Sequence, residues 1–278
     1  MKNLMLSPLV ALALTGSAFA SPPHLEKAWT AAGFDDPEGV AVAPDGALFI
    51  SNVAGDETGK DGAGWISRVT MSGEVLAARF IDGLDAPKGL AVHNGNLYVA
   101  DIDQVRIFNA ATGEPLDAAA IAGAKFLNDV TVWQDTIFVS DSGTGRIWRM
   151  TGASIDLWRE GGELAGVNGL LGSSGTLLVS TMTTGSLFEA TIEGAWRKIA
   201  DGMIDADGIG VVAANAGGGF LVSSWPGRIH HVSDDGAVAT RIDTTAEGIL
   251  QNDLTIVGDL VIVPNWEPGT VTAWRVKN

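Results

Sequence analysis

A polar residue followed by glycine or aspartate opens six short segments of the sequence, spaced roughly 40 to 50 residues apart. The polar residues carry carboxylate, amide or ammonium groups, and none of them is serine or threonine. Carboxylate and amide oxygens can bind a divalent cation, and a carboxylate can also take a proton from water. They can act together only if the fold gathers them. The six residues are Glu38, Lys88, Asn128, Asn168, Asp207 and Asn252.

Two carboxylates in this set decide which chemistry is favoured. At about 6 Å and an effective dielectric near 20, Glu38 and Asp207 would repel by roughly 3 kcal/mol. A bound cation would relieve that repulsion, and so would the ammonium group of Lys88. The oxygen ligands favour Ca²⁺ first and Mg²⁺ or Mn²⁺ next, with Zn²⁺ a lesser alternative because no cysteine or histidine belongs to the set. The alternative without chemistry is that these are ordinary turn residues whose polar side chains only hydrate a channel.

The elements that must position these residues are themselves repeated. After each polar pair come an alternating apolar run, a turn and a short strand-forming segment, which are typical of buried strands bounded by turns. These second strands are expected at 48–51, 97–100, 137–140, 177–180, 220–223 and 260–263. Alternating third strands are expected at 64–69, 104–108, 145–150, 185–190, 227–232 and 269–274. Weaker fourth strands follow, as at 75–81 and 196–200.

A repeat of this length matches the roughly 40 to 45 residues of a propeller blade. The sixth copy ends after three strands, and residues 24–33 resemble a fourth strand, so this segment is expected to complete the last blade. We therefore predict an all-β fold, a six-bladed β-propeller of four-stranded antiparallel blades closed by the N-terminal strand. Residues 21–278 form one domain in this prediction. A β-sandwich is the alternative, which six in-phase copies disfavour.

The first twenty residues are expected to be a signal peptide. Lys2 precedes an apolar stretch over 4–14, and Ala18-Phe19-Ala20 forms a small-x-small cleavage site. The mature chain would then be exported to the periplasm or the medium, and the absence of cysteine means that no disulfide stabilises it. A net charge of −16 disfavours nucleic acid and anionic membrane surfaces as partners, and no later segment is apolar enough to span a bilayer.

Other chemistries find little support in the sequence. The histidines, at 24, 93, 230 and 231, fall outside the register of the polar set, and no Gly-x-Ser-x-Gly turn is present. The acidic loop 55–62 is longer than its counterparts. It could bind a second calcium ion or cover the channel mouth, but it lacks the spacing of a calcium loop and is more often a solvated insertion.

The polar pairs carry a resemblance to a known family. Glu38-Gly39, Asn128-Asp129, Asn168-Gly169 and Asp207-Gly208 resemble, in order and type, the axial positions of the SMP-30/gluconolactonase/LRE-like family of six-bladed propellers. The resemblance covers essentially the whole mature chain and implies metal-dependent hydrolysis of lactones or esters. It also implies that Glu38, Asn168 and Asp207 are metal ligands and that Asn128 contacts the substrate or a metal-bound water. Asp207 would in addition be the base.

Two residues depart from the family. Sugar lactonases of this family often place an arginine two residues before the third-blade asparagine, where this chain has Phe126, so a less polar lactone or ester is as plausible a substrate as a sugar lactone. Lys88 could compete with the metal. Metal-free relatives such as strictosidine-synthase-like and NHL-type propellers leave a non-enzymatic binding protein as the alternative to a hydrolase.

Overall fold

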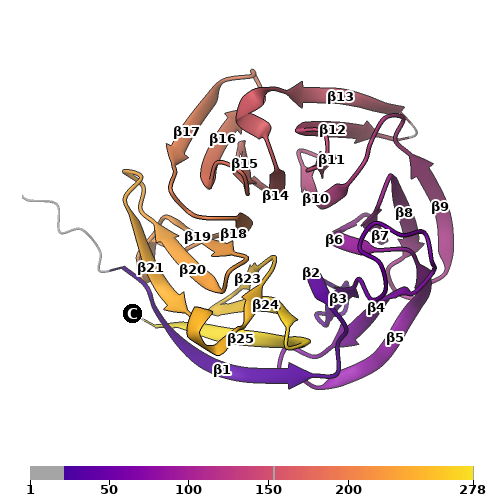
Figure 1. Cartoon of the computed structure of the whole chain (residues 1–278), viewed down its shortest axis with the longest axis horizontal. Helices are drawn as coiled ribbons and strands as arrows, with labels where there is room; N and C mark the ends of the chain where they lie inside the picture. The colour runs from indigo at the N-terminus through magenta and orange to yellow at the C-terminus, as the bar shows by residue number, and fades with distance from the viewer. Residues whose placement is uncertain (1–21, 153, 278) are drawn as a thin grey trace, which may run out of the picture.

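The computed structural model describes residues 22–152 and 154–277, which form six antiparallel sheets arranged as a ring around a central axis (Figure 1). In five of the sheets the first strand along the chain lies nearest the axis and the last lies at the periphery, whereas in the sixth sheet the N-terminal strand is the outermost. The predicted six-bladed β-propeller is confirmed. The predicted signal peptide lies outside the described residues.

Five blades each consist of four consecutive strands. Blade 1 contains β2 (Pro37–Val42), β3 (Leu48–Asn52), β4 (Gly64–Val69) and β5 (Val75–Leu84). Blade 2 contains β6 (Pro87–His93), β7 (Asn96–Asp101), β8 (Gln104–Asn109) and β9 (Pro115–Ala120). Blade 3 contains β10 (Leu127–Trp133), β11 (Thr136–Asp141), β12 (Arg146–Thr151) and β13 (Ser154–Glu160). Blade 4 contains β14 (Val167–Ser173), β15 (Thr176–Thr181), β16 (Ser186–Thr191) and β17 (Trp196–Ala200). Blade 5 contains β18 (Ala206–Val211), β19 (Phe220–Ser224), β20 (Arg228–Val232) and β21 (Val238–Asp243).

The sixth blade joins the two ends of the chain. Its innermost strand is divided into β22 (Leu250–Gln251) and β23 (Thr255–Val257), which both pair with β24 (Leu260–Glu267). The next strand, β25 (Thr270–Lys277), pairs with β1 (His24–Ala32), from His24 opposite Lys277 to Ala32 opposite Thr270. The prediction that the N-terminal segment closes the ring is therefore confirmed.

Apolar clusters between neighbouring blades stabilise the ring. Between blades 1 and 2, Phe49 and Ile66 pack with Leu90 and Leu97. A corresponding cluster lies at each of the other five junctions, including the one between blades 6 and 1. Because the chain has no cysteine, this packing and the strand pairing hold the blades together.

The innermost strands approach one another closely around the axis. A Cβ atom on Gly39 would lie 2.5 Å from the carbonyl oxygen of Lys88, and one on Gly169 would lie 2.3 Å from that of Asp207. The glycine after the polar residue is therefore required by the neighbouring blade. The interpretation of these pairs as turn residues is wrong in blades 1 to 5, because there the pairs lie within the innermost strands.

The helical segments of the described chain are short. They are the 3₁₀ turns η1 (Gly162–Leu164), η2 (Ala214–Ala216) and η3 (Thr245–Glu247). None of the helices in residues 22–152 and 154–277 has the length and apolar character needed to cross a bilayer.

Candidate functional site

The six polar residues of the repeat, called the polar ring from here on, lie at breaks in the pairing of the innermost strands. In blade 1 the register shifts between Pro37 and Val40, on either side of Glu38, and blades 2 to 5 show the same shift at their polar pairs. In blade 6 the pair lies between β22 and β23. A bulge redirects one side chain without disturbing the strand beyond it. The polar group can therefore face the axis while the following residues stay in the core.

Serine hydroxyls on the second strands fix the backbone of the polar ring. The Oγ of Ser140 accepts a hydrogen bond from the amide N–H of Asp129 at 2.8 Å. The same hydroxyl donates a hydrogen bond to the carbonyl oxygen of Asn168, in the next blade, at 2.7 Å. Ser180 repeats the arrangement, accepting from Gly169 at 2.9 Å and donating to the carbonyl oxygen of Asp207. Each serine thus links two neighbouring innermost strands, which holds adjacent ring residues at a fixed spacing.

All members of the polar ring line one cavity of about 270 Å³, called the axial cavity below. The six side chains are 2 to 5% exposed, so they form its floor. Glu57 and four large apolar side chains complete the lining, and all of these are more exposed than the ring. The apolar side chains, called the mouth wall, are Phe126, Met182, Trp225 and Trp266.

Burial of the two ring carboxylates dominates the electrostatics of the cavity. Burial and then the charge of Asp207 raise the pKa of Glu38 well above its usual range, while Lys88 lowers it. Burial and then the charge of Asp253 raise the pKa of Asp207 well above its usual range, and a hydrogen bond from Asn168 lowers it. Ionised carboxylates are therefore unfavourable here without a compensating positive charge.

Asn168 supplies an oxygen with no partner. It is 2% exposed, and its Oδ1 accepts no hydrogen bond although the atom is buried. Since the amide group donates to Asp207, the free oxygen completes a hard donor set with Glu38 and Asp207. Within residues 22–152 and 154–277 no three His, Cys, Asp or Glu side chains are grouped to hold a metal. A cation in this cavity would therefore need the amide oxygen as a ligand.

Among the described residues, Lys88 contacts two carbonyl oxygens and an aromatic ring and forms no ion pair with Glu38. Its Nζ donates to the carbonyl oxygens of Glu57 at 3.1 Å and Ala86 at 3.3 Å, and it lies 4.3 Å from the ring centre of Phe126. In the described part of the chain, no ion pair within 4.0 Å joins Lys88 to Glu38. Burial lowers the pKa of Lys88, and the charge of Glu38 raises it. Lys88 thus lowers the pKa of Glu38 through its charge without forming an ion pair with it.

Two further aspartates lie toward the other end of the channel. Asp129 and Asp253 line a second cavity of about 300 Å³, which shares no lining residue with the axial cavity. Oδ2 of Asp129 accepts the N–H of Leu170 in blade 4 at 2.6 Å, and Oδ2 of Asp253 accepts that of Val40 in blade 1 at 3.4 Å. Burial raises the pKa of Asp253 to about 7. These carboxylates therefore bridge neighbouring blades.

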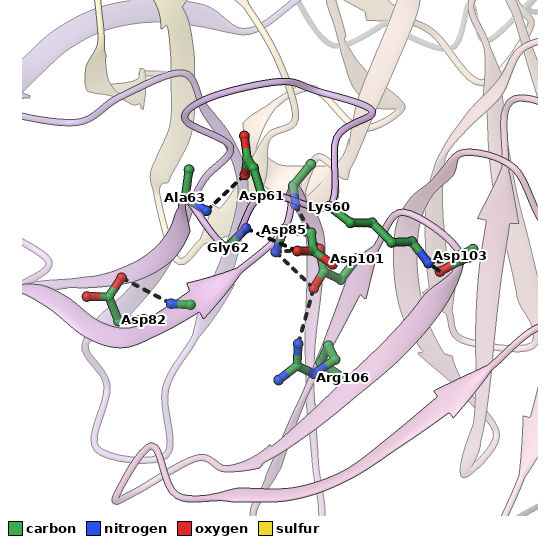
Figure 2. A network of polar contacts seen from close by, with 11 residues as sticks. Lys60, Asp61, Gly62, Ala63, Asp82, Asp85, Asp101, Asp103 and Arg106 are labelled. Atoms are coloured by element: carbon green, nitrogen blue, oxygen red, sulfur yellow. Dashed lines mark hydrogen bonds and ion pairs between the residues drawn. The ribbon is translucent and has the colours of Figure 1, made fainter.

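The acidic loop of blade 1 is bound to blade 2 and contributes to the opening of the axial cavity. Figure 2 shows Lys60 paired with Asp103 at 2.7 Å and the amide of Gly62 donating to Asp85 at 3.2 Å. The carboxylate of Asp61 accepts amide N–H groups of its own loop, from Asp56 and Ala63. Because Glu57 lines the cavity, the loop borders the channel mouth.

Sequence reasoning placed Phe126 beside the site and missed the rest of the mouth wall. Met182 and Trp225 follow the second strands of blades 4 and 5, each two residues beyond the serine of that strand, Ser180 or Ser223, and Trp266 lies near the end of β24, the second strand of blade 6. Register analysis of the strand ends would have found them, as it found the polar ring at the strand starts.

Comparison with known proteins identifies the fold. No protein-family model matches the sequence, and no curated protein matches it. A gluconolactonase from Xanthomonas campestris is 17% identical with a TM-score of 0.71, over 93% of this chain and 96% of that one. Virginiamycin B lyase from Staphylococcus aureus, as a catalytically inactive histidine-to-alanine variant with quinupristin, is 14% identical with a TM-score of 0.63, over 92% and 99% of the two chains. A chain of a nidogen/laminin complex is 15% identical with a TM-score of 0.63, over 84% and 87%. The likeness shows a propeller fold that enzymes and a protein complex share.

Proposed function

We propose that this chain hydrolyses lactones or simple esters and that it does so with a divalent cation, Ca²⁺ in first place, in the axial cavity. The observation that carries the proposal is the unpartnered, buried Oδ1 of Asn168 beside two buried carboxylates. An unsatisfied buried oxygen costs free energy, and so do buried negative charges. One hard cation would compensate all three groups.

The lining of the axial cavity agrees with such a cation. Glu38, Glu57 and Asp207 place three carboxylates in it against the single ammonium of Lys88. Glu38, Asn168 and Asp207 would hold the ion. When bound, a divalent cation supplies Lewis-acid polarisation of a substrate carbonyl.

The remaining steps belong to the side chains of the cavity floor. Asp207 accepts a proton from the attacking water, whose oxygen adds to the carbonyl carbon. The acyl carbon–oxygen bond then breaks, and the proton passes from Asp207 to the departing alkoxide, so that one water and one lactone give one hydroxy acid. Asn128 lies in the same floor and would orient the substrate by hydrogen bonding.

The fold neighbours supply two points of support. A gluconolactonase shares the propeller over nearly the full length of both chains. The lyase of the same fold is described as inactive without one of its histidines, whereas none of the described residues that line the axial cavity is a histidine. A carboxylate base therefore suits this cavity better than a histidine-dependent elimination. The export signal expected at residues 1–20 would place the activity outside the cytoplasm.

The test compares Asp207→Asn with wild type on a panel of lactones and esters at saturating Ca²⁺. The substitution keeps the shape and one oxygen ligand but removes the base, so kcat should fall by about 10²- to 10⁴-fold. Asp117→Asn, an exposed change on β9, is the matched control and should retain wild-type turnover.

Absence of cation-dependent turnover across the panel, or an Asp207→Asn variant as active as wild type, would contradict the proposal. The cavity would then be better explained as the ligand site of a non-enzymatic binding propeller.

A further inference from the structure

We infer that the mouth wall selects substrates with an apolar substituent, a lactone or ester whose reactive carbonyl faces the polar ring while an alkyl group contacts the aromatic side chains. The inference rests on the proposed function and names its substrate class.

The mouth wall provides apolar surface that the core does not use. Phe126, Met182, Trp225 and Trp266 are all partly exposed, in contrast to the buried polar ring beneath them. Trp266 packs against a small buried cluster made of Val53, Ala86 and Ile102. Trp266 is thus held by core packing, and all four side chains line the cavity, as apolar side chains generally do in ligand pockets.

The mouth offers few groups that could recognise sugar hydroxyls. Glu57 is the charged side chain that lines the cavity outside the polar ring, and the ammonium of Lys88, which belongs to the ring, already contacts two carbonyl oxygens and the face of Phe126. A site that selects a polyhydroxylated substrate needs partners for those hydroxyls, because unpaired polar groups weaken binding. The polar partners of this cavity are concentrated in its floor, where the carbonyl must lie.

The division into a polar floor and an apolar mouth fixes the orientation of the substrate. Burial of one methylene group favours binding by about fourfold. The cavity of about 270 Å³ lies near the lower end of the roughly 300–1,000 Å³ of ligand pockets, so the gain should level off once the alkyl group fills it.

The test measures kcat/KM for γ-alkyl-γ-butyrolactones of increasing chain length and for glucono-1,5-lactone, at saturating Ca²⁺. We expect kcat/KM to rise by about fourfold for each of the first methylene groups, mainly through KM, and to exceed that for the sugar lactone. Trp225→Ala should flatten this dependence, and Trp225→Phe should restore most of it. Leu157→Ala, an exposed change on β13, is the control for an apolar truncation outside the site.

Turnover without chain-length dependence, or a preference for the sugar lactone, would overturn the inference while leaving the proposed hydrolase intact. If no lactone is hydrolysed, calorimetric binding of 2-alkylcyclopentanones, which cannot be hydrolysed, still tests the mouth wall. Binding that tightens with chain length and weakens in Trp225→Ala is then the expected result. No binding, or binding insensitive to Trp225→Ala, would overturn the inference.

Discussion

Replacing Asp253 by asparagine should make the protein increasingly stable relative to wild type as pH rises from 4 to 8. Asp253 accepts the N–H groups of Leu254 at 2.7 Å and Val40 at 3.4 Å. Asparagine has a single acceptor oxygen, so it can accept the shorter bond from Leu254 while its NH₂ group loses the longer bond from Val40. The substitution therefore removes a largely buried charge, and it gives up the bond between blades 6 and 1 at a cost of about 1 kcal/mol that does not depend on pH.

The magnitude follows from the raised pKa of Asp253, which burial moves from 3.8 to about 7 in the folded protein. The unfolded chain loses this proton near pH 3.8 and the folded chain near pH 7, so the folded state is progressively disfavoured as pH rises between these values. At 1.36 kcal/mol per pKa unit, the ionisation of Asp253 lowers the free energy of unfolding of wild type by about 1.5 kcal/mol at pH 5 and by about 4 kcal/mol above pH 7. Because Asp253 is partly exposed, these figures are upper bounds.

Urea unfolding of wild type and Asp253→Asn from pH 4 to pH 8, with chelator in every sample, measures the difference directly. The free energy of unfolding of the variant, relative to that of wild type, should rise by up to about 4 kcal/mol from pH 4 upward and become constant above pH 7. Asp117→Asn should show no such growth, because Asp117 is exposed. A difference that does not change with pH, or that falls as pH rises, would show that burial does not hold Asp253 in its protonated form.

Three further predictions concern the polar ring and its support. Ser180→Ala leaves the amide of Gly169 and the carbonyl of Asp207 without their partner, so urea unfolding should show a loss of about 1–3 kcal/mol. Gly172→Ala places a Cβ atom 2.1 Å from the carbonyl oxygen of Val132, and overpacking should lower the free energy of unfolding by about 1–3 kcal/mol in the same assay. Ca²⁺ at a hundredfold excess over its dissociation constant should stabilise wild type by about 2.7 kcal/mol, measured by thermal unfolding, and Asn168→Ala should reduce the gain. Unchanged stability in either of the first two variants, or an equal calcium effect in the third, would count against the corresponding contacts.

The repeat made the fold and the convergence of the polar ring predictable. Residues at equal positions in successive blades occupy equal positions around the axis, so Glu38 and Asp207 could be brought together although they lie far apart in the sequence. The closing strand β1 was predictable for the same reason, because the last copy lacks a fourth strand.

The contacts between blades were less accessible from the sequence. Asp129 and Asp253 look like turn residues beside an asparagine, and their bridges to Leu170 and Val40 depend on how closely neighbouring inner strands approach. Whether Lys88 pairs with Glu38 could not be predicted from the sequence either. Its ammonium group donates to the carbonyl oxygens of Glu57, in the acidic loop, and of Ala86, in the connection before β6. Non-local geometry of this kind has no signature in the repeat.

Calorimetric titration of chelator-treated protein with Ca²⁺ tests the central claim most directly, because the proposed hydrolysis depends on a cation in the axial cavity. Saturable binding of one ion per chain is expected, weakened strongly by Asn168→Ala and by Asp207→Asn and left unchanged by Asp117→Asn. Absence of saturable binding of Ca²⁺, Mg²⁺, Mn²⁺ or Zn²⁺, or binding that survives both ring substitutions, would contradict it.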